Sequence, residues 1–280
     1  MKILNSVADV KTYISTIKAL GRSIGFVPTM GALHEGHLSL IIRAHEDNDI
    51  TVASIFVNPI QFNNKTDLAK YPRPIEKDIQ KLEEIGCDML FYPTVEEMYP
   101  EPVFDKYDFG QLDKVMEGKF RPGHFNGVAV VVRRLFDIVT PDKAYFGMKD
   151  YQQLRIIQTM VSTLKLQIEI IPCPIIREKD GLALSSRNVR LTKKQRSIAP
   201  AIFKVLSEIK DNARKTTVEE AENWAISKLN KYDEMFVEYL SIVDSETLLP
   251  IKDWDSTRSC LACVAVFLGE VRLIDNVMIF

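Results

Sequence analysis

Two histidines, His34 and His37, lie three residues apart in the stretch Pro28–His37 (PTMGALHEGH), which also contains Gly31 and Gly36. A short apolar segment precedes this stretch, and a helix-like segment follows it. Main-chain amides at the start of a helix bind phosphate well, and glycine lets the backbone approach a ligand closely. Two imidazoles on one face of a helical turn can donate hydrogen bonds to a triphosphate and to the charge that develops at its α-phosphorus. The stretch therefore predicts phosphate chemistry.

Two other interpretations of the histidines remain open, namely a metal-binding pair and two surface histidines. A metal pair needs a third ligand, and the stretch offers only Glu35, on a different face of the turn. Half of the chain's four histidines lie within this one turn. That concentration favours the phosphate interpretation.

Neutral amides follow two other apolar segments. Asn58 and Gln61 lie at the end of SIFVNPIQF, where uncharged donors and acceptors suit a hydroxylated substrate, although an ordinary Asn-Pro turn has the same sequence. Gln153 lies one turn into the helix predicted after FGMKD, where it can face the same crevice as Gln61. We interpret the two glutamines as candidate substrate ligands.

Basic residues precede two predicted helices. Lys149 can reach a phosphate as a point charge, whereas Asp150 next to it can serve equally well as a helix cap. Arg121 and His124 (RPGHFNGV) are placed for anion contact, or they form a capping loop.

A third cationic segment follows residue 176. From Arg177 to Arg196 there are seven basic residues and two acidic ones. A solvated helix face is the usual explanation of such a run. Here Gly181 and the sequence Leu184-Ser185-Ser186-Arg187-Asn188 favour a mobile loop that closes over phosphate, because two hydroxyls and a guanidinium can bind a leaving pyrophosphate.

The elements that must position these residues alternate between strand-like and helix-like patterns. Strands separated by helices of this length predict right-handed βαβ units, a parallel sheet and a Rossmann-like α/β fold, with ligands at the carboxyl ends of the strands. We expect this domain to cover residues 1–176, and a smaller α+β domain to cover residues 177–280. The expected strands are 23–27, 50–57, 88–92, 143–146, 166–171, 236–243, 261–268 and 271–274, and the expected helices are 37–47, 75–85, 128–138, 151–164, 195–210 and 218–229.

Composition argues against several classes of protein, although a local basic patch stays possible. The net charge of −2 over 280 residues gives no basic field for nucleic acid, and no apolar run approaches the roughly 20 residues that span a bilayer. The N-terminus lacks the apolar core of a signal peptide, so we expect a cytoplasmic protein. Cys260 and Cys263 form a CxxC, but they lie in an apolar strand pattern that points the two thiols to opposite faces.

The HxGH element of the histidine stretch resembles the signature of the nucleotidyltransferase superfamily. Six motifs in order, PTMGALHEGH, FVNPIQF, YPR, RPGHFNGV, GMKDYQQ and LSSRN, make residues 25–190 similar to the pantothenate synthetase family. One departure is Met148, where a polar residue is more usual, although contacts through the backbone need no particular side chain.

This resemblance implies condensation of pantoate with β-alanine, using ATP and Mg²⁺ and releasing AMP and pyrophosphate, by a homodimer. It implies that His37 is a proton donor supported by His34, that Gln61 binds pantoate and β-alanine, and that Gln153 binds pantoate. The residues it places around ATP are Met30, Gly31, Ala32, Leu33, His34, Glu35, Gly36, His37, Gly147, Met148, Lys149, Asp150, Ile176, Leu184, Ser185, Ser186 and Arg187. Asp78, in the helix after Tyr71-Pro72-Arg73, is a candidate magnesium ligand.

The expected mechanism has two steps. The pantoate carboxylate attacks the α-phosphorus to give pantoyl adenylate, and the amine of β-alanine then expels AMP. His34, His37, Lys149, Arg187 and Mg²⁺ supply positioning and charge stabilisation, so no enzyme nucleophile is needed.

Three rival functions remain to be separated from this one. An adenylyltransferase that acts on a phosphorylated acceptor would need a second cationic cradle, and Gln61 and Gln153 are neutral. A catalytically silent nucleotide-binding module would dispense with the histidines and the loop arginine, and both are present. A tRNA ligase would need an anticodon-binding extension or a strongly basic face, and neither is visible.

Overall fold

A computed structural model describes all residues from Met1 to Phe280, which fold into two compact units. The first unit comprises Met1–Phe109, Arg121–Met148 and Gln153–Pro174, and the second comprises Gly110–Phe120, Lys149–Gln152 and Ile175–Phe280. Two short segments of the first 174 residues, Gly110–Phe120 and Lys149–Gln152, therefore belong to the second unit. The domain boundary predicted at residue 176 stays a prediction.

The first unit is built on a six-stranded parallel sheet, which confirms the predicted α/β fold. The strand order is β1-β4-β3-β2-β5-β6. From β2 the chain builds β3 and β4 on one side and then β5 and β6 on the other, so the strand order reverses next to β2. Ligands of such sheets bind at this switch point. The strands are β1 (Lys2–Leu4), β2 (Ile24–Thr29), β3 (Ile50–Ile55), β4 (Met89–Phe91), β5 (Lys143–Gly147) and β6 (Glu169–Cys173).

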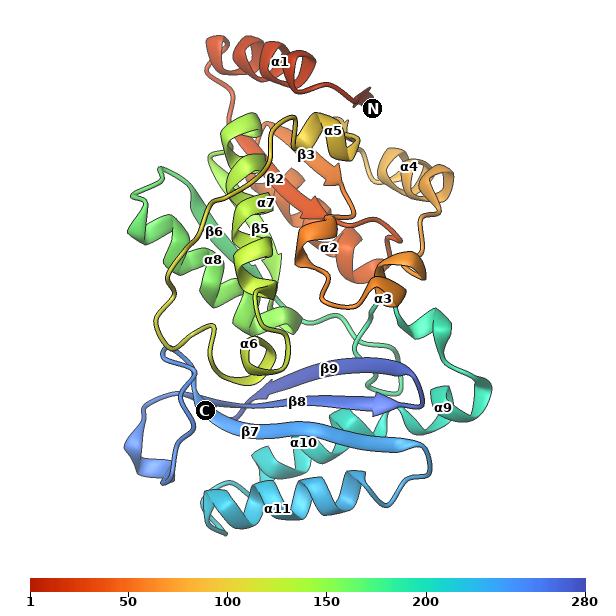
Figure 1. Cartoon of the computed structure of the whole chain (residues 1–280), viewed down its shortest axis with the longest axis vertical. Coiled ribbons are helices and arrows are strands. Elements are labelled where there is room, and N and C mark those ends of the chain that lie inside the picture. Colours follow the sequence, from red (N-terminus) through yellow and green to blue (C-terminus); the bar gives the residue numbers. More distant parts are fainter. The chain divides into compact units, whose positions relative to one another are not determined.

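Alternating side chains of β2 pack against helices on the two faces of this sheet. Phe26 contacts Phe136 of α7 (His124–Val139) edge to face, whereas Val27 belongs to the core cluster that contains Ile41 of α2 (Glu35–Asp47). Neighbouring strand residues point to opposite faces, so helices cover the sheet on both sides (Figure 1), and the central strand β3 is buried along its whole length. The helices of this unit are α1 (Val7–Ala19), α2 (Glu35–Asp47), α3 (Lys65–Ala69), α4 (Ile75–Glu84), α5 (Val95–Met98), α7 (His124–Val139) and α8 (Tyr151–Thr163), the last of which begins with residues of the second unit.

The second unit contains a three-stranded antiparallel sheet with β8 in the centre, which confirms the smaller α+β part of the fold prediction. Cys260 and Cys263 of β8 are buried free thiols in different core clusters, as expected for side chains on opposite faces. Burial raises the pKa of Cys260 to about 11 and raises that of Cys263 as well. The elements are α6 (Met116–Phe120), α9 (Lys193–Ile198), α10 (Ala201–Asp211), α11 (Val218–Leu229), β7 (Met235–Asp244), β8 (Cys260–Leu268) and β9 (Val271–Met278).

The inserted segment Gly110–Phe120 is fastened to this sheet by buried polar contacts. Glu117 accepts a two-fold hydrogen bond from Arg272 of β9 at 2.7 and 2.8 Å, and a third from the Tyr239 hydroxyl at 2.8 Å. Gln152 accepts from Glu117 N at 3.0 Å and donates to Leu112 O and Val115 O. These contacts explain why two short pieces of chain belong to the second unit.

Several helices differ from the sequence prediction. The short helices α3, α5 and α6 were not predicted, and two further differences have a clear physical reason. The single helix expected over 195–210 is wrong: Pro200, which has no N–H to donate, separates α9 from α10. Helix α1 was not predicted, although Ser6 caps it by accepting a hydrogen bond from Asp9 N at 3.1 Å.

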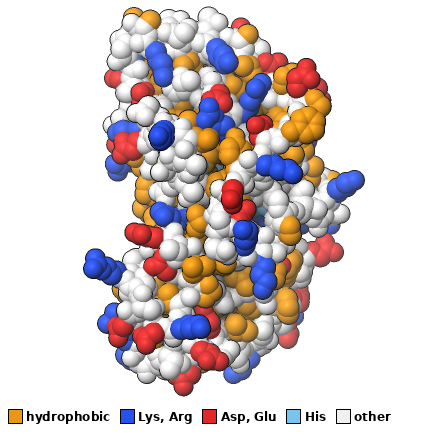
Figure 2. All heavy atoms as spheres, turned by 60° about the vertical axis from the view of Figure 1, so that its left-hand side comes forward, with side chains coloured by type: hydrophobic (Ala, Val, Ile, Leu, Met, Phe, Trp, Pro, Cys, Tyr) orange, Lys and Arg blue, Asp and Glu red, His pale blue; other side chains and the backbone are white.

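The surface carries both signs of charge. On the face shown in Figure 2, Lys and Arg side chains are interspersed with Asp and Glu, and no large block of one sign is visible. None of the helices is long and apolar enough to cross a membrane.

Candidate active site

The two histidines meet at the turn where β2 ends and α2 begins. His34 is the N-cap of α2, and its ring centroid lies 4.0 Å from that of His37. The main-chain N–H of His34 points to His37 Nδ1 at 3.4 Å. Since Nδ1 accepts in this contact, the neutral His37 ring carries its proton on Nε2 and can donate it from there. The predicted pairing of the two imidazoles on one turn is what the structure contains.

Helix α4 holds the main chain of this turn from the side. Asp78 accepts hydrogen bonds from Ala32 N at 2.7 Å and from Leu33 N at 2.8 Å, and Lys81 Nζ donates to Leu33 O. Burial raises the pKa of Asp78, and the two amide hydrogen bonds act in the opposite direction. Both carboxylate oxygens are therefore engaged in fixing the backbone. Magnesium ligation by Asp78 stays a prediction, and these contacts favour a structural role.

Gly31 is required at the tightest point of the turn. Its φ of +79° lies in the left-handed region, and a Cβ built there would lie 2.9 Å from Ile55 Cγ2 and 3.0 Å from Asp78 Oδ2. Ala32 also has a positive φ, of 52°. Glycine adopts such a φ readily, whereas alanine does so only at a cost, so the conformation of Ala32 depends on the contacts that hold it.

Gln61 lies behind the same turn and is held at three atoms. Its Oε1 accepts from Asn58 Nδ2 at 3.1 Å, its Nε2 points to the sulfur of Met30 at 3.2 Å, and its main-chain oxygen lies 2.9 Å from His124 Nδ1. The side chain is buried, with 8% exposure. The structure thus brings together Met30 and Gln61, which the sequence assigned to different ligands.

Asn58 and His124 have different roles from those suggested by their sequence positions. Asn58 is 1% exposed; its Nδ2 also donates to Gly127 O at 3.0 Å, and its Oδ1 accepts from the Tyr99 hydroxyl at 2.9 Å. Its amide therefore positions Gln61 and cannot serve a substrate as well. His124 contacts the main chain of Gln61 across the close approach of α7 at Gly127.

Several residues that were predicted to bind ATP lie close together in the second unit. Leu184 N donates to Ile176 O at 3.0 Å, so these two residues form the base of the 177–190 loop. Lys149 and Ser185 both line one small cavity. Ser185 Oγ accepts from Arg187 N at 3.3 Å, which turns the chain toward Asn188.

The remaining predicted residues fall at the ends of elements. Gly147 ends β5, Met148 and Asp150 lie in the 3₁₀ turn that follows, and Gln153 lies in the first turn of α8. A Cβ at Gly147 would meet open space, so the main chain there is accessible to a ligand. Glu35 and Gly36 open α2, and Ser186 and Arg187 belong to the loop of the second unit.

A family model described as pantoate-beta-alanine ligase matches residues 2–278. The chain belongs to this family.

Relatives of this ligase family align along the whole chain. The pantothenate synthetase of Porphyromonas gingivalis is 52% identical over 277 residues, and that of Bacteroides thetaiotaomicron is 47% identical over 277 residues. The alignments cover 99% of this chain and 99% and 98% of those proteins. The resemblance predicted from six motifs is confirmed, and so is the enzyme class, an ATP-dependent ligase.

Solved structures of the pantoate-beta-alanine ligase family have the same fold. The pantothenate synthetase of Thermus thermophilus superposes with a TM-score of 0.94 at 44% identity, with all of both chains covered. The Francisella tularensis enzyme, described as complexed with β,γ ATP and β-alanine, gives 0.83 at 36% identity and covers 99% of this chain and 97% of that one.

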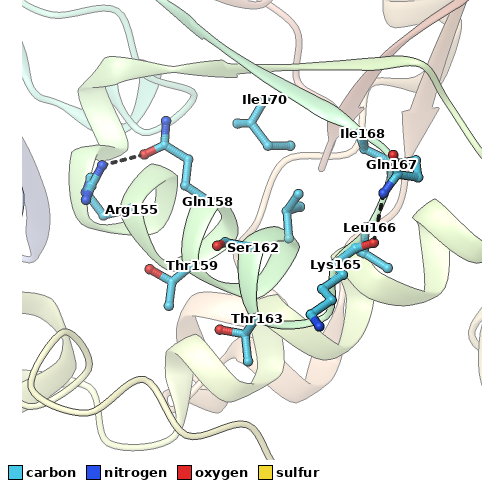
Figure 3. A pocket seen from close by; sticks show the side chains of 11 residues that line it. Arg155, Gln158, Thr159, Ser162, Thr163, Lys165, Leu166, Gln167, Ile168 and Ile170 are labelled. Atoms are coloured by element: carbon cyan, nitrogen blue, oxygen red, sulfur yellow. Dashed lines mark hydrogen bonds between the residues drawn. The ribbon is translucent and has the colours of Figure 1, made fainter.

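One large open groove of the first unit lies apart from these ligase motifs. It runs between α8 and the segment that leads into β6, and it is lined by Arg155, Gln158, Ser162, Lys165, Gln167 and Ile170 among others (Figure 3). None of the predicted site residues lines it. The groove is therefore separate from the candidate active site.

Proposed function

We propose that this protein condenses pantoate with β-alanine at the expense of ATP, through a pantoyl adenylate, and releases AMP and pyrophosphate. The observation that carries the proposal is the histidine turn at the sheet's switch point, where the ring centroids of His34 and His37 lie 4.0 Å apart at the start of α2. Stabilisation of charge by preorganised donors is usually the largest contribution to such a reaction.

In the first step, the carboxylate of pantoate attacks the α-phosphorus and pyrophosphate leaves. His37 donates from Nε2 to the oxygens on which charge develops, and the contact of its Nδ1 with His34 N keeps the ring in that tautomer. The turn formed by Met30–His37 is proposed to hold ATP, with Asp78 and Lys81 keeping the backbone in place before the substrate arrives.

Gln61 is proposed to bind pantoate and then to orient β-alanine, and Gln153 is proposed to bind pantoate. The amide of Gln61 is neutral, buried and held by Asn58, which fits a hydroxylated acid. A phosphorylated acceptor, as in an adenylyltransferase, would need cations at that position. The neutral pair therefore supports the ligase over this rival.

Gly147 and Met148 of the first unit are also proposed as nucleotide-binding residues, as are Lys149, Asp150, Ile176 and Leu184–Arg187 of the second unit. Lys149 and Arg187 supply positive charge, and Ser185 and Ser186 supply hydroxyl donors to the leaving pyrophosphate. In the second step the amine of β-alanine attacks the mixed anhydride and AMP leaves. Excluding water at this stage protects the anhydride from hydrolysis.

Magnesium is proposed to enter with ATP. The chain's donors fit an ion held mainly by phosphate oxygens and water, since the two Asp78 oxygens bind amides and no cluster of three or more His, Cys, Asp or Glu side chains is placed to hold a metal. Asp78 remains the candidate protein ligand, and bound magnesium would neutralise phosphate charge. The protein is further proposed to be a homodimer and to act in the cytoplasm.

The test is product analysis with the purified protein, ATP, Mg²⁺ and pantoate, with and without β-alanine. We expect AMP and pyrophosphate in equal amounts only when the amine is present, and exchange of labelled pyrophosphate into ATP with pantoate alone. A dinucleotide product with a phosphorylated acceptor would replace the ligase by an adenylyltransferase. Absence of AMP and of exchange under all combinations would refute the catalytic proposal.

A further inference from the structure

Two segments of the second unit are held by the same two residues of β9. Asn276 Nδ2 donates to the main-chain oxygen of Lys149 at 2.9 Å. Arg177 donates from Nη1 and Nη2 to the two oxygens of Asp275 at 2.6 and 2.9 Å, and from Nη2 to Asn276 O at 3.2 Å. Adjacent residues of one strand therefore tie the Lys149 turn to the base of the 177–190 loop.

Asp275 is a buried carboxylate, and both of its oxygens accept hydrogen bonds from Arg177. It is 4% exposed, and its Oδ1 also accepts from Asn276 N at 2.8 Å. It lies between Leu273 and Val277 in the alternation of β9, where an apolar residue would be expected. A two-point contact between a guanidinium and a carboxylate fixes orientation as well as distance.

Arg177 is fixed on its other sides too. Its guanidinium lies 3.9 Å from the ring centroid of Phe203 in α10, and its Nη1 also donates to Gly181 O at 3.2 Å. Arg177 pairs with Ala183 in an antiparallel bridge. Arg177 thus contacts both ends of the 177–183 turn, from which the rest of the loop continues.

The contacts of Arg177 also fix the main chain of residues that are proposed to bind ATP. Next to the bridge, Leu184 N donates to Ile176 O at 3.0 Å, and Ser185 follows directly. Lys149, Ser185, Asn188 and Asp275 line the same small cavity. A shift of β9 at Asp275 and Asn276 would therefore move Lys149 and Ser185 relative to each other.

We propose that Asp275 and Asn276 are positioning residues that set the spacing between Lys149 and the Ser185–Arg187 donors for one triphosphate. The inference rests on the proposed function, in which these groups contact ATP. Neither Asp275 nor Asn276 needs to touch the nucleotide. If they act only on fold stability, their replacement lowers stability without a selective change in ATP affinity.

The first test is Asn276→Ala in the full chain, compared with Asn230→Ala. Asn230 likewise makes one side-chain-to-main-chain hydrogen bond within the second unit, accepting from Val237 N at 2.9 Å, and it serves as the control. We expect Asn276→Ala to raise the KM for ATP about fivefold, the size expected for one lost hydrogen bond, with the KM values for pantoate and β-alanine unchanged. Asn230→Ala should leave all three unchanged.

The second test is Arg177→Lys, which keeps the charge but loses the two-point contact. We expect weaker binding of a non-hydrolysable ATP analogue and faster amide hydrogen exchange in residues 178–190, with thermal unfolding still cooperative. Asp275→Asn should act in the same direction. If that variant does not fold, Asn276→Ala and Arg177→Lys decide the question.

Unchanged ATP binding in both Asn276→Ala and Arg177→Lys overturns the inference, as does an equal rise of all three KM values. The proposed function is tested separately by AMP release from the unmodified protein. Because analogue binding needs no turnover, the variants still test the positioning role if the unmodified protein binds ATP but makes no AMP.

Discussion

Asp78 and Leu33 are separated by 45 residues, and the carboxylate Oδ1 of Asp78 accepts a hydrogen bond from Leu33 N at 2.8 Å. The second oxygen accepts from Ala32 N at 2.7 Å. Ala32 has a φ of 52°, and the preceding Gly31 has a φ of 79°. The carboxylate thus stabilises a left-handed turn that carries the histidines.

Replacing this carboxylate separates a structural role from a metal role. We expect Asp78→Asn to lower the free energy of unfolding by about 1–3 kcal/mol, because the amide NH₂ would face a main-chain N–H donor. The measurement is urea unfolding without ATP or magnesium. A ligand-free protein of unchanged stability, whose turnover needs more magnesium, would instead assign Asp78 to the metal.

His37 should matter for turnover more than for binding. We expect His37→Ala to lower kcat by about 10²–10⁴, the usual contribution of a positioned proton donor, with a smaller change in the KM for ATP. His45 lies on the same helix and is exposed, so His45→Ala is the control. Near-normal kcat in His37→Ala would remove the assigned role.

Asn58 is expected to act on the substrate through Gln61. Asn58→Ala removes the hydrogen bond to Gln61 Oε1 and the one to Gly127 O. We expect the KM for pantoate to rise about tenfold and stability to fall by about 1–3 kcal/mol. Asn63, whose Nδ2 donates to Pro122 O at an exposed position, provides the control Asn63→Ala. An unchanged pantoate KM would show that Gln61 does not depend on this contact.

The histidine turn could be recognised in the sequence because its residues are contiguous. The residues that hold the turn could not be assigned in the same way, because Asp78 and Lys81 belong to another helix. A signal was nevertheless present: Asp78 shares a helix face with Ile75, Ile79 and Leu82. A carboxylate on an apolar face needs a buried partner, and only the fold identifies it as the turn.

The same limit applies to the second unit. The strand pattern of β9 was partly predicted, over 271–274, and it ended before Asp275 because a carboxylate interrupts the apolar alternation. Its partner Arg177 lies 98 residues earlier. An ion pair between residues so far apart in the sequence cannot be detected from the local spacing of apolar residues.

Gly31 should tolerate no side chain. We expect Gly31→Ala to lower the free energy of unfolding by about 2–4 kcal/mol, because it combines an unfavourable φ with a Cβ 2.9 Å from Ile55 Cγ2. Gly21 has a φ of 69° with nothing within 4 Å of a built Cβ, so Gly21→Ala isolates the conformational part, about 1 kcal/mol. Equal losses in the two variants would mean that the contacts of the turn add nothing.

The acid limb of the stability curve should depend on Asp244, at the end of β7. Burial acts to raise the pKa of this carboxyl, but hydrogen bonds from Thr257, Thr247 and Glu246 N outweigh burial and lower the pKa to about 2. Since the unfolded value is about 3.9, the unfolded chain takes up the proton first as the pH falls. The contribution of Asp244 is therefore complete above about pH 4 and is lost between about pH 4 and pH 2. Urea unfolding at pH 5, 3.5 and 2.5 should give a shallower acid loss for Asp244→Asn than for the unmodified protein, and parallel curves would contradict this assignment.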